Sequence, residues 1–457
     1  MTGGLPDGVL LAFYGDDFTG STDAMEVTAF AGLRTVLFTR TPNAQDLASF
    51  ADYPVVGIAG TARSRSPEWM AQNLPGPFRA LADLSPRILQ YKVCSTFDSA
   101  ADVGSIGRAI DIGDSLVSGP WSPSIVGAPQ LGRWQVFANL FAAAGGTRYR
   151  IDRHPTMSRH PVTPMREADL RLHLAAQTKR DIVAIDVAAI ASGTADDAAD
   201  RARDKPGTIA FIDVADETTQ AEAGRLVWDG SDGPVFSASS SGLQYALVAH
   251  WRQAGMLPQT PIPFAPVPPV DRLLVLSGSC SPVTAEQIEI AEASGFETIR
   301  LDVAQAIAPD TAATEIARIE TAVDAAIERC GRVIVFAART VDDPAFAALQ
   351  RTAADRGISF SDAQHSIGRA LGRIAATAVP RLGLQRIVVA GGDTSGRVLE
   401  ASPVTALEIA HPLGKGAPIC RCHSRAPEFD GLQVVLKGGQ LGSPSLFVDA
   451  LGTQQAP

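Results

Sequence analysis

Two adjacent aspartates, Asp16 and Asp17, end an apolar run and precede a stretch that favours a helix, in the sequence VLLAFYGDDFTGSTDAM. In a structural interpretation, one aspartate caps the helix and the other is solvated, with residues 21–23 as further candidates for the cap. In a functional interpretation, one carboxylate is a general base and the other orients a hydroxyl group or a metal ion. We favour Asp17 as the catalytic base, with Asp16 as a close second and as a substrate contact.

Positively charged residues follow two further apolar runs. Arg63 and Arg65 lie in GTARSRS, and Lys92 lies in YKVCSTFDSAADVGSIG. Arginine presents a planar fork that suits a carboxylate, whereas lysine acts as a point charge. One such cation is typical of a solvated surface, but three on neighbouring loops predict a pocket for a small anion. The stretch after Lys92 adds hydroxyl and carboxylate groups that suit a polyol, namely Ser95, Thr96, Asp98 and Ser99.

Three loops in the second half of the chain combine small residues with the start of a helix, in LSGSCSPVTAEQI, VVAGGDTSGR and VVLKGGQLGS. Glycine allows close backbone approach, and amides at a helix start favour a phosphate group. The loops therefore predict a nucleotide site, without a GxxxxGK[ST] motif and without GxGxxG after a strand. We expect Thr284 and Gln287 to form a capping box. The candidate nucleotide contacts are Ser277, Ser279, Gly391, Gly392, Asp393, Thr394, Ser395, Gly438, Gly439 and Gly442.

Short β-rich runs must position these loops. They are VLLAFY, TVLF, PVVGIAG, RILQYKV, DIVAIDV, TIAFIDV and GPVFSAS in the first half, and RLLVLSG, TIRLDV, RVIVFAA and RIVVAGG in the second. Helix-compatible segments such as ATEIARIETAVDAAIERCG lie between them, which predicts an α/β fold with largely parallel sheets flanked by helices. Ligands bind beyond the carboxyl ends of such strands, where the loops described above lie. The closing stretch LQVVLKGGQLGSPSLFVDAL predicts a strand, a glycine loop and a final helix.

A proline-rich segment, PQTPIPFAPVPP, interrupts the alternation of strands and helices. Proline cannot sustain a helix interior or a central strand, so the segment predicts a linker over residues 257–270. The linker divides the chain into an N-terminal domain of residues 1–256 and a C-terminal domain of residues 271–457.

The composition of the chain excludes several classes of protein. The 457 residues carry a formal charge of -10, which argues against a nucleic-acid partner because such proteins cluster Lys and Arg. The five cysteines form no paired framework and the histidines have no zinc spacing, so we expect reduced thiols and no structural zinc site, with His160 as a turn residue. Without a signal peptide or a membrane-spanning run, the sequence predicts a cytoplasmic protein with no membrane partner. Its oligomeric state is left open, with a homo-oligomer as one option.

The ordered set of motifs resembles the four-carbon acid sugar kinase family. The resemblance rests on GDDFTGSTD, KVCSTFDSAADVGSIG, GRWQVFANLFAA, HPVTPMREADLRLHLAAQT, LSGSCSPVTAEQI, GGDTSG and LKGGQLGSPSLF. It implies that the N-terminal domain binds a sugar acid such as threonate or 3-oxo-tetronate, that the C-terminal domain binds ATP, and that the active site lies in the cleft between them. Arg63 and Lys92 would then grip the substrate carboxylate, and Mg²⁺ would offset charge on the phosphoryl group, with the metal ligands unknown.

The last motif departs from the family pattern, which is close to KSGNFGG, whereas this chain has KGGQLGS. The change suggests a divergent branch whose substrate is a relative such as 3-oxo-isoapionate. Two other functions remain alternatives. A phosphatase with an aspartate nucleophile would explain GDDFTG, but it would not need the three glycine loops. A non-catalytic sugar-acid sensor would explain the cations, but it would leave the paired aspartates without a role.

Overall fold

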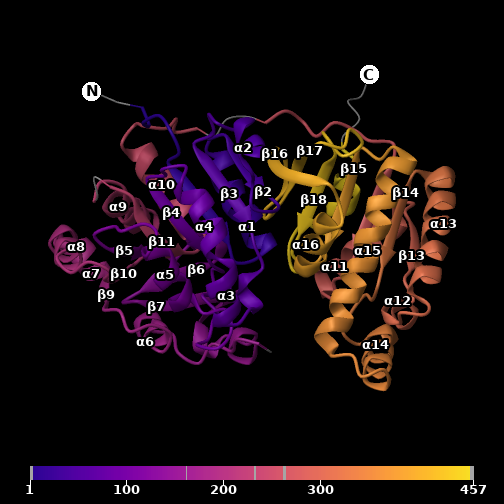
Figure 1. The fold of residues 1–457 in the computed structure, drawn as a ribbon, viewed down its shortest axis with the longest axis horizontal. Helices are drawn as coiled ribbons and strands as arrows, with labels where there is room; N and C mark the ends of the chain where they lie inside the picture. The colour runs from indigo at the N-terminus through magenta and orange to yellow at the C-terminus, as the bar shows by residue number, and fades with distance from the viewer. Residues whose placement is uncertain (1–3, 161, 231–232, 261–263, 453–457) are drawn as a thin grey trace. The chain divides into compact units, whose positions relative to one another are not determined.

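A computed structural model describes residues 4–160, 162–230, 233–260 and 264–452 of the chain. The chain divides into two compact units, Met1–Ile262 and Pro263–Pro457 (Figure 1). Each unit has a largely parallel sheet flanked by helices, which confirms the predicted two-domain α/β fold. The predicted domain bounds stay a prediction, and residues 261–263 of the predicted linker lie outside the described residues. The placement of the active site in a cleft also stays a prediction.

The main sheet of the first unit is parallel and pairs its strands in the order β11, β4, β1, β3 and β2. Its strands are β1 (Leu11–Gly15), β2 (Thr35–Phe38), β3 (Val55–Ala59), β4 (Ile88–Lys92) and β11 (Val235–Ser239), each predicted from an apolar run. These strands are buried along their whole length, so helices must cover both faces of the sheet. The helices α1 (Phe18–Phe30) and α10 (Gly242–Gln253) pack together, and so do α4 (Pro75–Ala82) and α5 (Ile106–Asp114).

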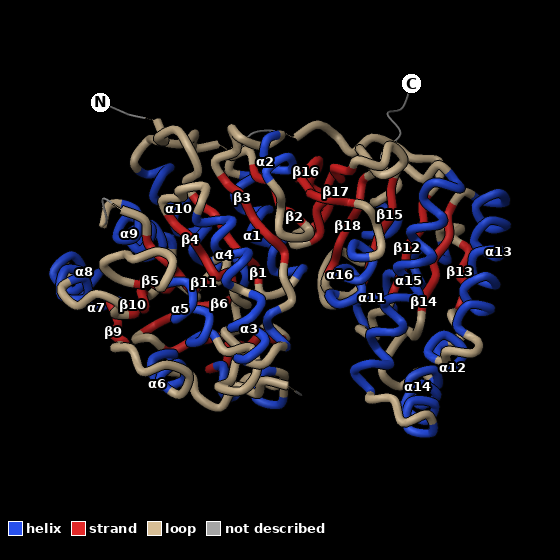
Figure 2. The backbone as a smooth tube through the Cα atoms, in the orientation of Figure 1, coloured by secondary structure: helices blue, strands red, loops and turns tan. Residues whose placement is uncertain are grey.

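The rest of the first unit contains two smaller sheets (Figure 2). One is parallel and comprises β5 (Ser122–Ser124), β10 (Ile209–Ile212) and β9 (Ile182–Ile185). The other is antiparallel and comprises β6 (Arg133–Val136), β7 (Asn139–Ala144) and β8 (Thr147–Arg150), which the sequence reasoning missed. The remaining α-helices of this unit are α2 (Ala44–Ala48), α3 (Pro67–Asn73), α6 (Leu170–Ala175), α7 (Val187–Ser192), α8 (Ala195–Arg203) and α9 (Glu217–Trp228).

The turn between β6 and β7 shows why this hairpin was hard to predict. Phe137 and Ala138 both have positive φ angles, 51° and 59°, without the glycine that such a turn favours. The buried carboxylate of Asp213 stabilises the turn, because it accepts a hydrogen bond from the Phe137 amide and a 3.0 Å hydrogen bond from the Ala138 amide. The partner that makes the turn possible is therefore 75 residues away in the sequence.

The sheet of the second unit pairs its strands in the order β16, β17, β18, β15, β12, β14 and β13. Five of these are parallel: β12 (Leu273–Ser277), β13 (Glu297–Arg300), β14 (Arg332–Phe336), β15 (Arg386–Ala390) and β18 (Gln433–Lys437), all predicted from the sequence. The antiparallel hairpin of β16 (Val404–Gly414) and β17 (Ala417–Ser424) was not predicted. Its long strands have register shifts, which break the regular alternation that marks a strand.

Helices cover this second sheet. They are α11 (Pro282–Ala293), α12 (Val303–Ile307), α13 (Ala312–Cys330), α14 (Pro344–Asp355), α15 (Phe360–Leu382), α16 (Gly392–Glu400) and α17 (Leu446–Asp449). The helices α13, α15 and α16 pack in series, whereas α11 packs with α17. The predicted final helix is therefore present, and it closes the core formed by β12, β15, β18 and α11.

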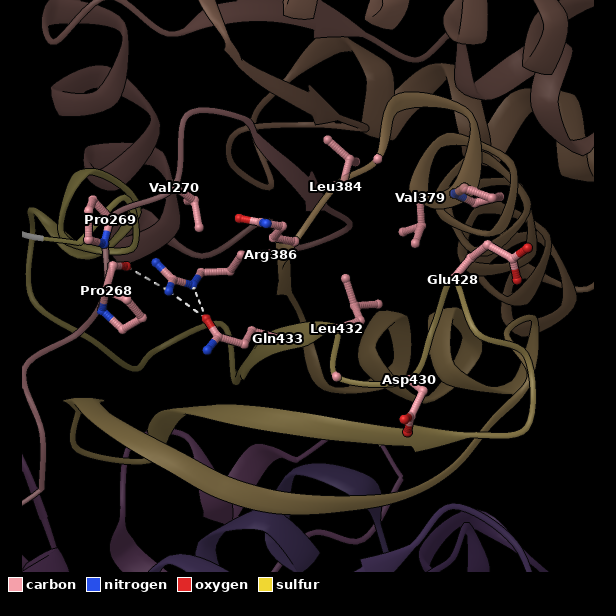
Figure 3. Close-up of a pocket in the computed structure, with 14 residues that line it drawn as sticks. Pro268, Pro269, Val270, Val379, Leu384, Arg386, Glu428, Asp430, Leu432 and Gln433 are labelled. Carbon is pink, nitrogen blue, oxygen red and sulfur yellow. Dashed lines mark hydrogen bonds between the residues drawn. The ribbon is translucent and has the colours of Figure 1, made fainter.

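A pocket of about 500 Å³ lies at the amino ends of β15 and β18 (Figure 3). The buried guanidinium group of Arg386 lies at this pocket and donates to the carbonyl oxygens of Pro268 (2.9 Å) and Ala450 (2.6 Å) and to the side chain of Gln433 (2.8 Å). These contacts tie the end of the proline-rich segment to the end of the chain. The glycine loops leave the opposite, carboxyl ends of the same strands.

Candidate active site

The loops that follow β1, β3 and β4 lie side by side at one edge of the first sheet. Gly15 is in register with Ala59 on one neighbouring strand and with Lys92 on the other. Backbone hydrogen bonds continue beyond the strands, from the Asp16 amide to the Lys92 carbonyl (2.9 Å) and from the Arg63 amide to the Asp16 carbonyl (3.0 Å). The structure therefore brings the predicted sugar-acid residues of all three loops together.

Arg63 binds both aspartates of the opening motif. Its Nε and one terminal nitrogen donate to the two carboxylate oxygens of Asp16 at 3.1 Å and 2.8 Å, and its other terminal nitrogen lies 2.9 Å from Asp17 Oδ2. Burial alone would lower the pKa of Arg63, but the charges of Asp16 and Asp17 raise it well above its usual value. Burial raises the pKa of Asp16, and the Arg63 charge opposes that rise. The guanidinium group thus holds the two carboxylates in fixed positions.

The two aspartates differ in their surroundings. Asp17 caps α1, because its Oδ1 accepts a 2.7 Å hydrogen bond from the Gly20 amide, and the helix begins at Phe18. The expectation that residues 21–23 could cap the helix was wrong, since these residues lie within its first turns. The structural interpretation holds for Asp17 as a cap, but Asp16 is not solvated: its side chain is only 5% exposed, against 31% for Asp17.

Lys92 ends β4 and is almost fully buried. Its Nζ donates to the carbonyl oxygen of Val93 at 3.0 Å, and within the described residues no carboxylate forms an ion pair with it. Gly20 makes room for this group, because a Cβ atom there would lie 3.1 Å from Lys92 Nζ and 2.4 Å from Asp17 Oδ1. Lys92 is thus a buried cation with donors to spare beside the paired aspartates.

The loop after Lys92 places a third carboxylate near the cluster. Asp98 is buried and accepts hydrogen bonds from the hydroxyl groups of Thr96 (2.5 Å) and Thr163 (2.9 Å). Burial would raise the pKa of Asp98, but the Arg63 charge and these hydroxyl groups hold it below its usual value. Ser95 is half-buried in the same loop. The surroundings of Asp98 therefore favour the ionised form of its carboxyl group.

Thr163 was not singled out from the sequence, although it lies in the motif HPVTP. The predicted turn role of His160 fits the structure, because its Nδ1 accepts a 3.0 Å hydrogen bond from the Thr163 amide. Pro161, between them, lies outside the described residues. The motif alone could have indicated Thr163, because its hydroxyl group is of the same kind as those chosen after Lys92.

The glycine loops of the second unit also lie at one sheet edge. Ser277 is in register with Ala390, and Ala390 is in register with Lys437. The Gly278 amide donates to the Ala390 carbonyl (3.1 Å), and the Gly391 amide donates to the Lys437 carbonyl (2.9 Å). The predicted nucleotide residues on the loops after β12, β15 and β18 are therefore neighbours.

Several features of this edge suit a phosphate group. Helix α16 begins at Gly392 without a side-chain cap, so its first amides are available to an anion. Gly391 has a φ angle of 117°, which favours glycine, and Ser395 Oγ bonds back to its carbonyl oxygen (2.8 Å). A Cβ atom on Gly439 would lie 2.8 Å from Ser279 Oγ, so the loops approach closely. The hydroxyl group of Ser277 is buried with no hydrogen-bond partner among the described residues.

The remaining candidates on these loops have clear positions. Asp393 is exposed in the first turn of α16, and Thr394 is buried beneath that turn. Gly438 directly follows β18, and Gly442 has a φ angle of 92°. Within the described residues no contact shows what these side chains and glycines do, so their contacts with a nucleotide stay a prediction.

The expected capping box of Thr284 and Gln287 was wrong. Ser281 caps α11, with Pro282 as its first residue, and both predicted residues lie inside the helix. Their side chains contact the buried ammonium group of Lys437 instead, each at 2.8 Å. Thr284 and Gln287 therefore bond to a side chain that is distant in the sequence instead of capping their own helix, and only the folded chain brings that partner to them.

The described residues contain no cluster of three or more His, Cys, Asp or Glu side chains that could hold a metal ion. None of the helices in the described ranges combines the length and the hydropathy that a membrane span needs. The described cysteines are all free thiols, as predicted.

The family comparisons agree with this arrangement. A family model described as a sugar-binding N-terminal domain matches residues 11–247, and one described as a nucleotide-binding C-terminal domain matches residues 274–447. The two models together describe a protein that binds a sugar through one domain and a nucleotide through the other. The chain belongs to the family that combines these two domains, and its predicted membership of the four-carbon acid sugar kinases is confirmed.

The chain is similar over its length to curated kinases. It is 52% identical to a 3-oxo-isoapionate kinase of Paraburkholderia graminis, over 97% of this chain and 94% of that protein. It is 31% identical to a 3-oxo-tetronate kinase of Methylobacterium radiotolerans, over 95% and 97% of the two chains. A solved structure from Salmonella typhimurium LT2, titled a putative tRNA synthase, has a TM-score of 0.77 at 24% identity over 96% of this chain and 98% of its own, which supports the fold alone.

Proposed function

We propose that the chain transfers the γ-phosphoryl group of ATP to a hydroxyl group of 3-oxo-isoapionate or a close analogue. The observation that carries this proposal is the buried ammonium group of Lys92 beside the Arg63 pair, in a chain that is 52% identical to a 3-oxo-isoapionate kinase. The charge of Lys92 acts on Asp16, but no described carboxylate contacts the ammonium group itself, and a sugar acid would supply that direct partner. We assign the acid to residues 1–256 and the nucleotide to residues 271–457.

Asp17 is proposed as the general base. Its side chain is the more exposed of the pair, whereas both oxygens of Asp16 are held by Arg63 in a buried site. The substrate hydroxyl oxygen forms a bond to the γ-phosphorus atom as the bond from phosphorus to the ADP oxygen breaks, and the hydroxyl proton passes to Asp17. Asp16 keeps Arg63 in place and helps to orient the substrate.

Lys92 is proposed as the main contact of the substrate carboxylate. Arg63 already uses three of its five N–H donors on the aspartates, so it can add a second, weaker contact through the other two. The carboxylate of Asp98 would accept hydrogen bonds from the substrate hydroxyl groups. The hydroxyl groups of Thr96 and the half-buried Ser95 would donate hydrogen bonds to them or accept hydrogen bonds from them. This division gives the anion and the polyol part of the substrate different partners.

The nucleotide phosphates would bind at the edge formed by the loops after β12, β15 and β18. The free amides at the start of α16, the Ser277 hydroxyl group and the close approach at Gly439 all fit a phosphate-bearing ligand. ATP supplies the phosphoryl group and Mg²⁺ offsets its negative charge. Since Mg²⁺ usually keeps waters and binds phosphates rather than an all-protein cage, the proposal needs no clustered protein ligands.

The test is a coupled assay for ADP formation over a panel of threonates, erythronates, 3-oxo-tetronates and 3-oxo-isoapionate. We expect ADP to appear fastest with 3-oxo-isoapionate and to require Mg²⁺. Release of inorganic phosphate from a sugar-acid phosphate, without ATP, would support the phosphatase alternative. Binding of the acid with no ADP formed under any condition would support the sensor.

A further inference from the structure

Lys437 is a buried cation in the second unit that the proposed mechanism does not yet use. Its side chain is 0% exposed, and its Nζ donates to Thr284 Oγ1 (2.8 Å), Gln287 Oε1 (2.8 Å) and the Gly439 carbonyl oxygen (3.3 Å). It also lies 5.8 Å from the ring centre of Phe447. All these partners are neutral, and in the described part of the chain no carboxylate pairs with it. Burial lowers the pKa of Lys437 to about 8.

The partners of Lys437 tie the glycine loop to α11. Thr284 Oγ1 donates to the Gly439 carbonyl oxygen (3.0 Å), and Gln287 Nε2 donates to the carbonyl oxygens of Leu441 (3.2 Å) and Ser443 (2.8 Å). Lys437 contacts both of these α11 side chains, so it lies at the centre of the network. The ammonium group therefore fixes the two side chains that hold the loop, and it also contacts the loop directly at Gly439.

The orientation of one peptide bond links this network to the nucleotide site. In a trans peptide plane the carbonyl oxygen and the following N–H point in opposite directions. Because the Gly439 carbonyl points inward at Lys437 and Thr284, the N–H of Gln440 points away from them, and Gln440 is exposed. A protonated Lys437 strengthens this arrangement by attracting the carbonyl oxygen.

We propose that Lys437 is a positioning residue of the nucleotide site: its ammonium group holds the glycine loop with the Gln440 amide outward and adds positive charge beneath the phosphates. Loss of its proton then weakens the hold on the loop and removes that charge, so nucleotide binding falls. This inference rests on the proposed function, because it takes the Gly438–Gly442 loop to be a phosphate site.

Other titratable groups near Lys437 do not explain such a pH dependence. On α11, Glu286 and Glu289 are exposed, as is Asp393 on α16. Asp449 on α17 is exposed and bonds to Ser443 and Ser445. Cys280, in the loop after β12, has a pKa raised above its usual value by burial, so it stays a neutral thiol near pH 8.

The experiment measures the Kd of MgATP by calorimetry on the full chain, without sugar acid, from pH 6.5 to 9.5. Wild type is expected to bind about tenfold more weakly at pH 9 than at pH 7, because only the protonated fraction binds well. Lys437→Met should bind at least about tenfold more weakly at pH 7, with little further change at pH 9. Lys437→Arg should still bind MgATP measurably. Its Kd should not change between pH 7 and pH 9, because arginine stays protonated.

Arg386→Lys is the matched control, because Arg386 is a buried cation at the opposite end of the same sheet. This variant should have a lower Tm, but its Kd for MgATP and the dependence of that Kd on pH should match those of wild type. A flat wild-type pH profile, or wild-type affinity in folded Lys437→Met, would overturn the inference alone. No MgATP binding by wild type at any pH would overturn the proposed function and the inference together.

Discussion

The guanidinium group of Arg63 grips the carboxylate of Asp16 through two hydrogen bonds, of 3.1 Å and 2.8 Å, in a site where Asp16 is nearly buried. Arg63 therefore has a structural task besides any contact with substrate. Removing one partner of such a pair leaves a buried charge without compensation. A mutation of Arg63 should therefore affect the stability of the chain as well as substrate binding.

Arg63→Ala is expected to lower both stability and kcat, rather than to raise only the KM for the acid. The loss of stability should be about 3 kcal/mol, which is typical of breaking a buried pair. Thermal unfolding and steady-state kinetics measure the two effects. Arg34→Ala is the control, since its ion pair with Asp52 is exposed and should contribute little. A variant with wild-type Tm and only a higher KM would contradict this view of Arg63.

Asp17→Asn should lower kcat by roughly 10² to 10⁴, because it removes the proposed base. Folding should be unaffected, since asparagine is also a good N-cap. Asp16→Asn should act more on stability and substrate binding than on kcat. Asp23→Asn, in the same helix, serves as the control. The reverse ranking would exchange the two roles, and normal turnover in both variants would reduce the pair to a helix cap and its anchor.

Lys92→Met should raise the KM for the sugar acid by about 10- to 150-fold, which corresponds to a charge-assisted hydrogen bond of about 1.5 to 3 kcal/mol. The Kd of MgATP should stay at its wild-type value. Kinetics with varied acid and calorimetry with nucleotide separate these two quantities. An unchanged KM would exclude Lys92 as the carboxylate contact.

Gly20→Ala should abolish most activity while the chain stays folded. Alanine is favoured within a helix, but its Cβ would lie 2.4 Å from Asp17 Oδ1 and 3.1 Å from Lys92 Nζ. Gly76→Ala in α4 is the matched control, because a Cβ there has no atom within 4 Å. Circular dichroism and kcat should report a folded, inactive protein for the first variant and wild-type behaviour for the second.

Asp213 should make stability fall as pH rises from about 4 to 6. Burial raises its pKa from 3.8 to about 6, so in this window the folded chain binds more protons than the unfolded chain. The shift corresponds to at most about 3 kcal/mol. Thermal unfolding of wild type and Asp213→Asn at pH 4, 5, 6 and 7 isolates this effect. The stability difference between the two proteins should change across the window and be constant above it; a constant difference throughout would contradict the assignment.

The sequence alone determined which residues stand at the ends of the parallel strands. The apolar runs that lead to the candidate sites end where a glycine or a charge begins, and the carboxyl ends of parallel strands meet at one edge of a sheet. For this reason the alignment of Gly15 with Lys92, and of Ser277 with Ala390, followed from strand assignments that were correct. The glycine loops and the paired aspartates were found on the same basis.

Only the tertiary structure decided how each charge is paired. Asp16 and Asp17 are neighbours in the chain, yet one is buried against Arg63 and the other caps a helix, and Arg63 is 47 residues from Asp16. Lys437 depends on Thr284 and Gln287, about 150 residues earlier. Local patterns follow from the preferences of short segments, whereas the free energy of a buried charge depends on partners that distant segments bring to it. The sequence therefore specified where the candidate sites are, and the fold specified which of their charges lack a direct partner of opposite charge among the described residues.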